Sequence, residues 1–275
     1  MLIFPCTFDL EKEARELEGT YANYSHYSHP IAEDARIYAP DGTLFARYMP
    51  EKLSAEVLEL ALPVMKAVKT RISNRGTAAY KGSMFNRVRK SDGLLAATRE
   101  VAAEVAELLG YSDQIGYLEG KPGTEARGTQ YCRPTQITRE HPERLTLMRP
   151  LALEVDGIFE NELPMEYAAQ VAAIAAAGKY RITDAYSTIN LNRDWQTAYH
   201  RDANDLPDGW AAIFVGGEYA GGDLTVPRYR LRFELRPGTL LFFKPHEIHG
   251  NLPFSGELLQ GVLFGREHIA SCGGQ

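Results

Sequence analysis

The sequence predicts an α+β protein built on a double-stranded β-helix, a jelly-roll or cupin-like barrel, with a helical N-terminal half packed on it. Two observations carry this prediction. Residues 92–110 and 164–177 have the apolar spacing of amphipathic helices, whereas the C-terminal third consists of short β-type runs separated by turn residues. We therefore expect a single domain over residues 1–275, in which residues 1–180 are mainly helical and loop support and residues 181–268 form the barrel core.

The expected helices all lie in the N-terminal half. Residues 52–71 show helical periodicity, with a bend or break expected near Pro63, because proline lacks the N–H that an interior helical turn needs. Residues 92–110 give the clearest amphipathic pattern, and residues 150–160 and 164–177 predict two further helices.

The expected strands follow one another at regular spacing after residue 181. Glycine-, asparagine- and proline-rich turns separate them, which is typical of a sandwich or a jelly-roll barrel. The six runs are ITDAYSTINLN, GWAAIFVGG, GDLTVP, LRFEL, GTLLFF and LLQGVLFG.

Composition indicates an ordinary globular chain. Hydrophobic residues make up 44% and charged residues 24% of the sequence, and no apolar run is long enough to cross a membrane, so no membrane partner is expected. The three cysteines are odd in number, far apart and without metal or redox spacing, so we expect them to be reduced and mostly inert. These features predict a monomer in the cytoplasm, or in the nucleus if the organism is eukaryotic.

Charge is distributed unevenly along the chain. The net charge of -6 excludes a uniformly basic nucleic-acid binder. Residues 61–100, however, hold nine basic against two acidic side chains. Such a stretch either contacts phosphates or forms a solvated helix face with its loop, and the sequence leaves both readings open.

A candidate metal site lies at the predicted strand ends. His200 and Asp202 are two residues apart just after the run STINLN, and a second histidine comes from PHEIHGNLP. Two imidazoles and one carboxylate form the facial triad of non-haem iron(II) oxygenases, which leaves positions open for a co-substrate and dioxygen. His246 and His249 both compete for the third place. We favour His249 because a turn follows it directly and returns the chain to the last strand.

The quoted motifs resemble those of a known family. YSTINLNRDWQTAYHRDANDLPDGW, GGEYAGGDLTVPRY and PGTLLFFKPHEIHGN are similar to the TET/JBP family of iron- and 2-oxoglutarate-dependent nucleic-acid-base dioxygenases. With SNRGTAAYKG and YCRPTQIT upstream, the resemblance covers most of residues 73–268. It implies Fe(II) and 2-oxoglutarate as cofactors and a DNA or nucleotide substrate. It also implies that His249, in the motif HGN, is the distal ligand.

The resemblance further implies residues around the metal. Asp205, three residues after the iron-binding aspartate, falls where the family contacts the base edge, and Asn74 and Arg75 match its SNRG segment on the substrate side. Turn or loop roles are the alternative for all three. Asn190 and Asn192, on the strand before the metal motif, are candidates to steady the co-substrate, or are polar residues at a strand edge.

One position departs from the family pattern. Relatives carry an arginine on the last strand that holds the far carboxylate of 2-oxoglutarate, and we assign that position here to Leu258. A leucine cannot replace a guanidinium fork. Either Arg193, Arg181 or Arg266 supplies the charge, or the co-substrate is ascorbate or another reductant.

The predicted function is that of a single-domain, non-haem iron(II) dioxygenase that depends on 2-oxoglutarate. Its expected reaction oxidises a methyl C–H group on a nucleic-acid base such as 5-methylcytosine. Two alternatives are a small-molecule hydroxylase that acts on a nucleoside or natural product, and a non-catalytic jelly-roll binding protein. Salt dependence separates the first alternative from a polymer-acting enzyme, and iron binding separates the second.

Overall fold

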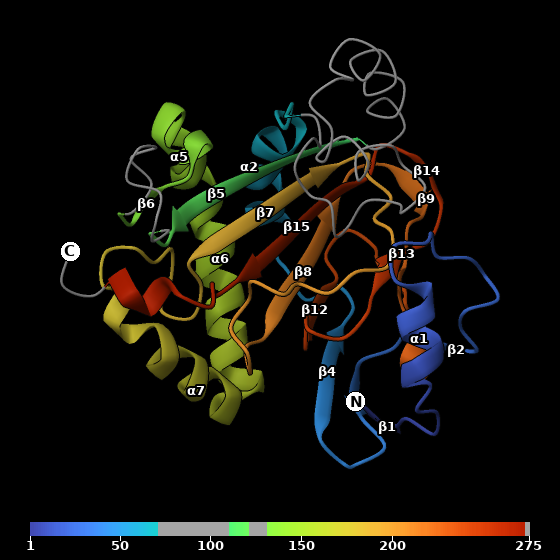
Figure 1. Cartoon of the computed structure of the whole chain (residues 1–275). Coiled ribbons are helices and arrows are strands. Elements are labelled where there is room, and N and C mark those ends of the chain that lie inside the picture. Colours follow the sequence, from blue (N-terminus) through green and yellow to red (C-terminus); the bar gives the residue numbers. More distant parts are fainter. Residues whose placement is uncertain (71–109, 121–130, 273–275) are drawn as a thin grey trace, which may run out of the picture.

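The computed structural model describes residues 1–70, 110–120 and 131–272. Its centre is a nine-stranded mixed sheet, which crosses the molecule in Figure 1. In spatial order the strands are β1 (Leu2–Pro5), β3 (Ala35–Tyr38), β4 (Leu44–Met49), β12 (Leu240–Phe243), β8 (Ala211–Gly216), β15 (Leu259–Phe264), β7 (Thr188–Arg193), β5 (Tyr111–Leu118) and β6 (Arg133–Pro134).

The described part of the chain also forms two smaller sheets. The larger of them has four strands, in the order β13 (Gly250–Asn251), β10 (Leu224–Val226), β11 (Leu231–Phe233) and β2 (His29–Ile31). The other pairs β14 (Phe254–Gly256) with β9 (Tyr219–Gly221). A buried apolar cluster joins β4, β8 and β12 of the large sheet to β10 and β11 of the four-stranded sheet, so these two sheets enclose a common core. This arrangement is consistent with a double-stranded β-helix.

Helices cover the other face of the large sheet. α2 (Ala55–Lys66) and α6 (Pro142–Glu162) pack there through a second apolar cluster that includes residues of β7, β8 and β15. The other helical segments within the described residues are α1 (Glu11–Leu17), α5 (Gln136–Glu140), α7 (Pro164–Ile174) and the short 3-10 turns η2 (Ala175–Ala177), η3 (Pro227–Tyr229) and η4 (Ile269–Cys272). None of the helices within the described ranges is long and apolar enough to span a membrane.

Strand alternation separates the two cores. On β8, Ala212 and Phe214 belong to the cluster under the helices, whereas Ile213 and Val215 belong to the cluster between the sheets. A period of two residues produces this division, because successive side chains of a strand point to opposite faces. The inner face of the large sheet therefore looks toward the four-stranded sheet.

Several sequence predictions are confirmed in outline. Residues 150–160 lie inside the longer helix α6, and residues 164–177 form α7 and η2. Pro63 lies inside α2 and does not end it. The N–H that proline lacks would have bonded to the carbonyl of residue 59, which is exposed on the helix surface, so water can satisfy it. The predicted helix 92–110 lies almost entirely outside the described residues.

The expected helical N-terminal half is not confirmed. Strands β1 to β4 dominate residues 1–49, and β5 adds another strand from the same half to the large sheet. These strands are short, and β4 finds its antiparallel partner β12 about 190 residues further along the chain. Local periodicity does not reveal such a pairing.

The expectation for the cysteines was wrong. Cys132 and Cys272 form a disulfide that links residues 140 apart, and Cys6 is free and buried. The pair lies in a small apolar cluster with Ile174 and Leu206. Only the folded chain brings the two sulfurs together, so their spacing in the sequence carried no signal.

Candidate metal centre

His200 and His249 lie side by side on neighbouring backbone segments. They form an isolated antiparallel bridge, in which each residue's N–H donates to the other's carbonyl at 3.0 Å. The two imidazole centroids are 4.5 Å apart. The N–H of Asp202 donates to the carbonyl of Pro245 at 3.1 Å. Backbone hydrogen bonds thus hold all three predicted ligands together before any metal binds.

Both imidazoles have a fixed orientation. Nδ1 of His200 contacts the carbonyl of Ala198 at 2.8 Å, and Nδ1 of His249 contacts the carbonyl of Glu247 at 2.8 Å. A carbonyl only accepts, so Nδ1 carries a proton in both rings, and Nε2 is the ring nitrogen that is left to face a metal. Both Nε2 atoms then face Asp202, each 3.6 Å from one of its carboxylate oxygens.

The ligand atoms of the three side chains lie within 4.8 Å of one another. Cis ligands at about 2.1 Å from a metal are about 3 Å apart, so the observed spacing fits one ion with little movement. His200 is 8% and His249 4% exposed, whereas the side chain of Asp202 is about a third exposed. The cluster is thus buried on the histidine side and open on the carboxylate side.

The electrostatics of His249 favour metal binding. Burial, followed by the nearby His200, lowers the pKa of the His249 imidazole to about 4, against a smaller opposing effect of Asp202. The ring is therefore neutral near pH 7 and does not need to lose a proton before it binds an ion. Phe243 packs edge-on against it, with ring centroids 4.9 Å apart.

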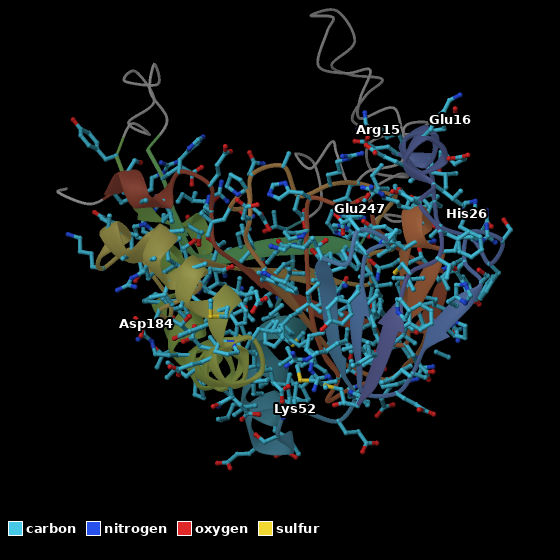
Figure 2. All side chains as sticks on the ribbon, turned by 90° about the horizontal axis from the view of Figure 1, so that it is seen from below. Arg15, Glu16, His26, Lys52, Asp184 and Glu247 are labelled. Atoms are coloured by element: carbon cyan, nitrogen blue, oxygen red, sulfur yellow. A yellow bond between two sulfur atoms is a disulfide. The ribbon has the colours of Figure 1, made fainter. Side chains whose placement is uncertain are left out.

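An ion-pair chain supports the turn before His249. Arg228 donates to the Glu247 carboxylate at 2.9 Å and to Asp9 at 2.7 Å. Figure 2 labels Glu247 on the side of the molecule that α1 occupies. Since the carbonyl of Glu247 also fixes the His249 ring, the N-terminal segment helps to position a candidate metal ligand.

His246 lies outside the three-residue cluster. Its Nε2 contacts the carbonyl of Leu206 at 2.8 Å and so ties the loop after Asp202 to the turn before His249. The geometry supports the choice of His249 over His246 as the third ligand.

Two of the candidate arginines, Arg193 and Arg266, lie at opposite ends of the neighbouring strands β7 and β15. These strands are antiparallel, with Leu259 opposite Arg193 and Phe264 opposite Thr188. Arg266, just beyond Phe264, forms a backbone bridge with Asp205 in the loop that follows Asp202. Arg266 therefore lies at the metal end of β15, whereas Arg193 lies at the opposite end.

The position assigned to the family arginine, Leu258, lies at the other end of β15 from Arg266. Leu258 is at the far end of β15, is 2% exposed, and belongs to the apolar cluster between the sheets. It packs against Gly222, where an added Cβ would meet a Leu258 carbon at 3.0 Å. The resemblance to the family had placed the carboxylate-binding position at Leu258, whereas the strand pairing puts Arg266 next to the loop that follows Asp202.

A family model decides what kind of protein this is. The Tet_JBP model, which describes the oxygenase domain of the 2OGFeDO superfamily, matches residues 117–266, more than half of the chain. This chain belongs to the Tet_JBP family. The resemblance noted from the sequence motifs is thereby confirmed.

Similar proteins include thymine dioxygenases of trypanosomatids. The bifunctional helicase and thymine dioxygenase JBP2 of Leishmania major is 32% identical over 122 residues, which are 44% of this chain and 11% of that protein. Thymine dioxygenase JBP1-A of Trypanosoma cruzi is 26% identical over 251 residues, 87% of this chain and 26% of that protein. The matched stretches are thus a small part of those relatives.

A solved structure shares the fold. NgTET1, in a complex with 5mC DNA, superimposes with a TM-score of 0.56 at 13% identity, over 96% of this chain and 89% of that one. Together with the sheet arrangement described above, this likeness supports the double-stranded β-helix within the Tet_JBP chain.

The other arginine candidates have local partners. Arg193 donates to the carbonyl of Lys66 at 2.8 Å and lies over the Tyr111 ring, 4.7 Å from its centroid. Arg181 donates to the carbonyls of Gly178 and Asp184, both at 3.3 Å. Asp184 lies on the α7 side in Figure 2, away from the turn of Glu247.

Asn190 and Asn192 belong to a buried polar row on β7. Ser112 donates to Asn190 at 3.2 Å, and Asn190 donates to Asn192 at 3.0 Å. Gln260 lies directly opposite Asn192 on β15 and is also buried. The sequence pointed to the two asparagines but missed Ser112 and Gln260, because the cross-strand pairing that aligns them is non-local.

The predicted substrate residues are partly described. Asp205 is buried, and its N–H donates to the carbonyl of Asp202 at 3.1 Å, so the two carboxylates belong to one tight turn. Asn74 and Arg75 lie outside the described residues, as does most of the basic stretch 61–100.

Proposed function

We propose that this single-domain chain is an iron(II)- and 2-oxoglutarate-dependent dioxygenase that oxidises the methyl group of a nucleic-acid base. The observation that carries the proposal is the convergence of two imidazole Nε2 atoms and one carboxylate in a chain of the Tet_JBP family. Iron(II) with 2-oxoglutarate and dioxygen, when bound there, supplies the oxidising power that breaks a C–H bond.

The protein's own residues prepare the site. His200 and His249 are held by Nδ1 hydrogen bonds, so little rotamer freedom remains to be lost when an ion binds. Asp202 completes the facial set and contributes a negative charge that balances part of the ion's charge. Its partial exposure leaves room for a substrate to approach.

Arg266 is our choice for the far carboxylate of 2-oxoglutarate. It follows β15 at the metal end, and a guanidinium forms charge-assisted, paired hydrogen bonds with a carboxylate. Arg193 and Arg181 are weaker candidates because their donors serve carbonyls elsewhere. The buried Asn190–Asn192 row is our choice for a polar wall beside the co-substrate.

Within the family, 5-methylcytosine is the base that we favour. The named relatives point to two bases, because the trypanosomatid proteins are thymine dioxygenases and NgTET1 was solved with 5mC DNA. Cytosine carries an exocyclic amine where thymine carries a carbonyl. Asp205, as an acceptor beside the metal turn, suits the amine and repels the carbonyl.

One assay tests the substrate and the co-substrate together. Purified protein with iron(II) is incubated with duplexes that contain 5-methylcytosine or thymine and with the free nucleosides, and mass spectrometry follows each base and succinate. We expect one succinate per hydroxymethylated base and no turnover by Asp202→Ala. Turnover without 2-oxoglutarate would favour ascorbate or another reductant, and turnover of nucleosides alone would favour a small-molecule hydroxylase.

The same assay separates the arginines. Arg266→Leu should raise the KM for 2-oxoglutarate by about 30-fold or more, since losing one side of a buried charge pair costs about 2–5 kcal/mol. Arg193→Leu, at the far end of the strands, is the matched control and should leave that KM within about twofold. The reverse ranking would contradict our choice of Arg266.

A further inference from the structure

Arg266 already has a carboxylate partner. Its Nη2 donates to Oε1 of Glu119 at 3.0 Å, and its Nε donates to Oε2 of the same group. Both residues are buried, with 8% of Arg266 and 9% of Glu119 exposed. The pair is thus a two-pronged ion pair in the protein interior.

The pair spans the start of β7. In the sheet, β7 lies between β5 and β15; Glu119 follows the end of β5, and Arg266 follows the end of β15. The N–H of Arg266 donates to Oγ of Ser187 at 3.2 Å, and Arg133 donates to the carbonyl of Glu119 at 3.1 Å. Both backbones are anchored, so the carboxylate determines the plane of the guanidinium.

Among the described residues, hydrogen-bond acceptors occupy one edge of the Arg266 guanidinium. Its five N–H donors form two forks, a side edge with Nε and Nη2 and an end edge with Nη1 and Nη2. Glu119 occupies the side edge. Within the described ranges no residue accepts a hydrogen bond from Nη1 of Arg266, so the end edge remains open to a second carboxylate.

A buried ion pair of this kind is by itself weak evidence for a stabilising role. Desolvating two charges costs about as much as their attraction returns, and well-packed apolar residues often replace a buried ion pair without loss. The same chain holds a second buried arginine, because Arg47 on β4 lies between Asp34 and Glu162, and strands β12 and β8 separate β4 from β15 in the large sheet. Glu162 therefore provides a matched control.

We propose that Glu119 is a positioning residue for co-substrate binding, which holds Arg266 by its side edge so that the end edge receives the far carboxylate of a 2-oxo diacid. The inference rests on the proposed function. Glu119 itself does not touch the co-substrate. Without Glu119, the buried guanidinium loses both its compensating charge and its fixed plane. The far carboxylate of the co-substrate then binds to it less tightly, because the donors are no longer aligned.

The test compares two keto acids that differ only in the far carboxylate arm. 2-Oxoglutarate and pyruvate both chelate iron(II) through the 2-oxo acid group, and only the former reaches for Arg266. Each is titrated without oxygen into the iron(II)-loaded protein, and the charge-transfer absorption of the chelate reports binding. The measured quantity is the ratio of the two dissociation constants, which is independent of turnover.

The expected result depends on the side chain at position 119. The wild-type protein should bind 2-oxoglutarate much more tightly than pyruvate. Glu119→Ala should reduce this preference about tenfold or more, equivalent to about 1.4 kcal/mol. Glu119→Gln retains one acceptor, and its preference for 2-oxoglutarate over pyruvate should lie between those of the wild type and the alanine variant. This variant also keeps the test valid if the alanine variant does not fold. Glu162→Gln should lower the melting temperature and leave the preference unchanged, because its partner Arg47 is remote from the co-substrate.

The outcomes separate this inference from the proposed function. If wild type prefers the diacid and both Glu119 variants retain that preference in full, the positioning role is wrong while the proposed function stands. If the iron(II)-loaded wild type binds neither keto acid, both are wrong. A reduced preference in the Glu119 variants together with an unchanged one in Glu162→Gln supports the inference.

Discussion

Removal of His249 should abolish stabilisation of the fold by metal ions. An ion at 100 times its dissociation constant stabilises a protein by about 2.7 kcal/mol. For a chain of this size, 1 kcal/mol corresponds to about 2–4 °C in melting temperature, so the wild type should gain about 5–11 °C on saturation with metal. Of the cluster found among the described residues, His249→Ala leaves His200 and Asp202, and we expect less than about 2 °C of that gain to remain.

The alanine variant also changes the metal-free protein. It loses the bond from Nδ1 to the Glu247 carbonyl and the contact with Phe243, which should cost about 1–3 kcal/mol. The relevant quantity is therefore the difference between the melting temperatures with and without metal for each variant. Circular dichroism under anaerobic conditions with iron(II), or with manganese(II) as a stable substitute, measures it.

His246→Ala is the matched control. Its ring contacts the Leu206 carbonyl and lies outside the ligand cluster, so this variant should be less stable than wild type but should gain as much from metal. A full metal-induced gain in His249→Ala, or its loss in His246→Ala, would refute our assignment of the third ligand.

Three further predictions concern the fold around the site. Leu258→Arg should lower the free energy of unfolding by several kcal/mol, because an unpaired guanidinium would be buried at a position that is 2% exposed. A lower KM for 2-oxoglutarate in this variant would contradict our placement of Leu258 away from the co-substrate. Cys132→Ser should cost about 2–5 kcal/mol in denaturant unfolding, since the disulfide closes a separation of 140 residues, and adding reductant should erase its difference from wild type. Gly261→Ala should be strongly destabilising, because its Cβ would lie 2.0 Å from a ring carbon of Phe214. Gly157→Ala lies on helix α6 with nothing within 4 Å of its Cβ, and it should raise the free energy of unfolding by about 0.5–1 kcal/mol. Equal melting temperatures for the two variants would refute the packing argument.

The sequence determined the parts of this protein whose signals are local. His200 and Asp202 are two residues apart and His249 precedes a turn, so a candidate metal triad could be predicted from order and spacing, and the fold brings these three side chains together. The helices at residues 150–160 and 164–177 were also predictable, because apolar periodicity repeats within a few turns.

Only the tertiary structure decided which distant residues meet. Arg266 reaches the metal loop because β15 runs antiparallel to β7 and β8, and the same pairing carries Leu258 to the opposite end. Glu119 meets Arg266 across β7 although the two are separated by 147 residues, and the cysteines meet across 140. The pairing of strands fixes such contacts, and a pairing register is a property of two segments at once. No single segment of the sequence carries it.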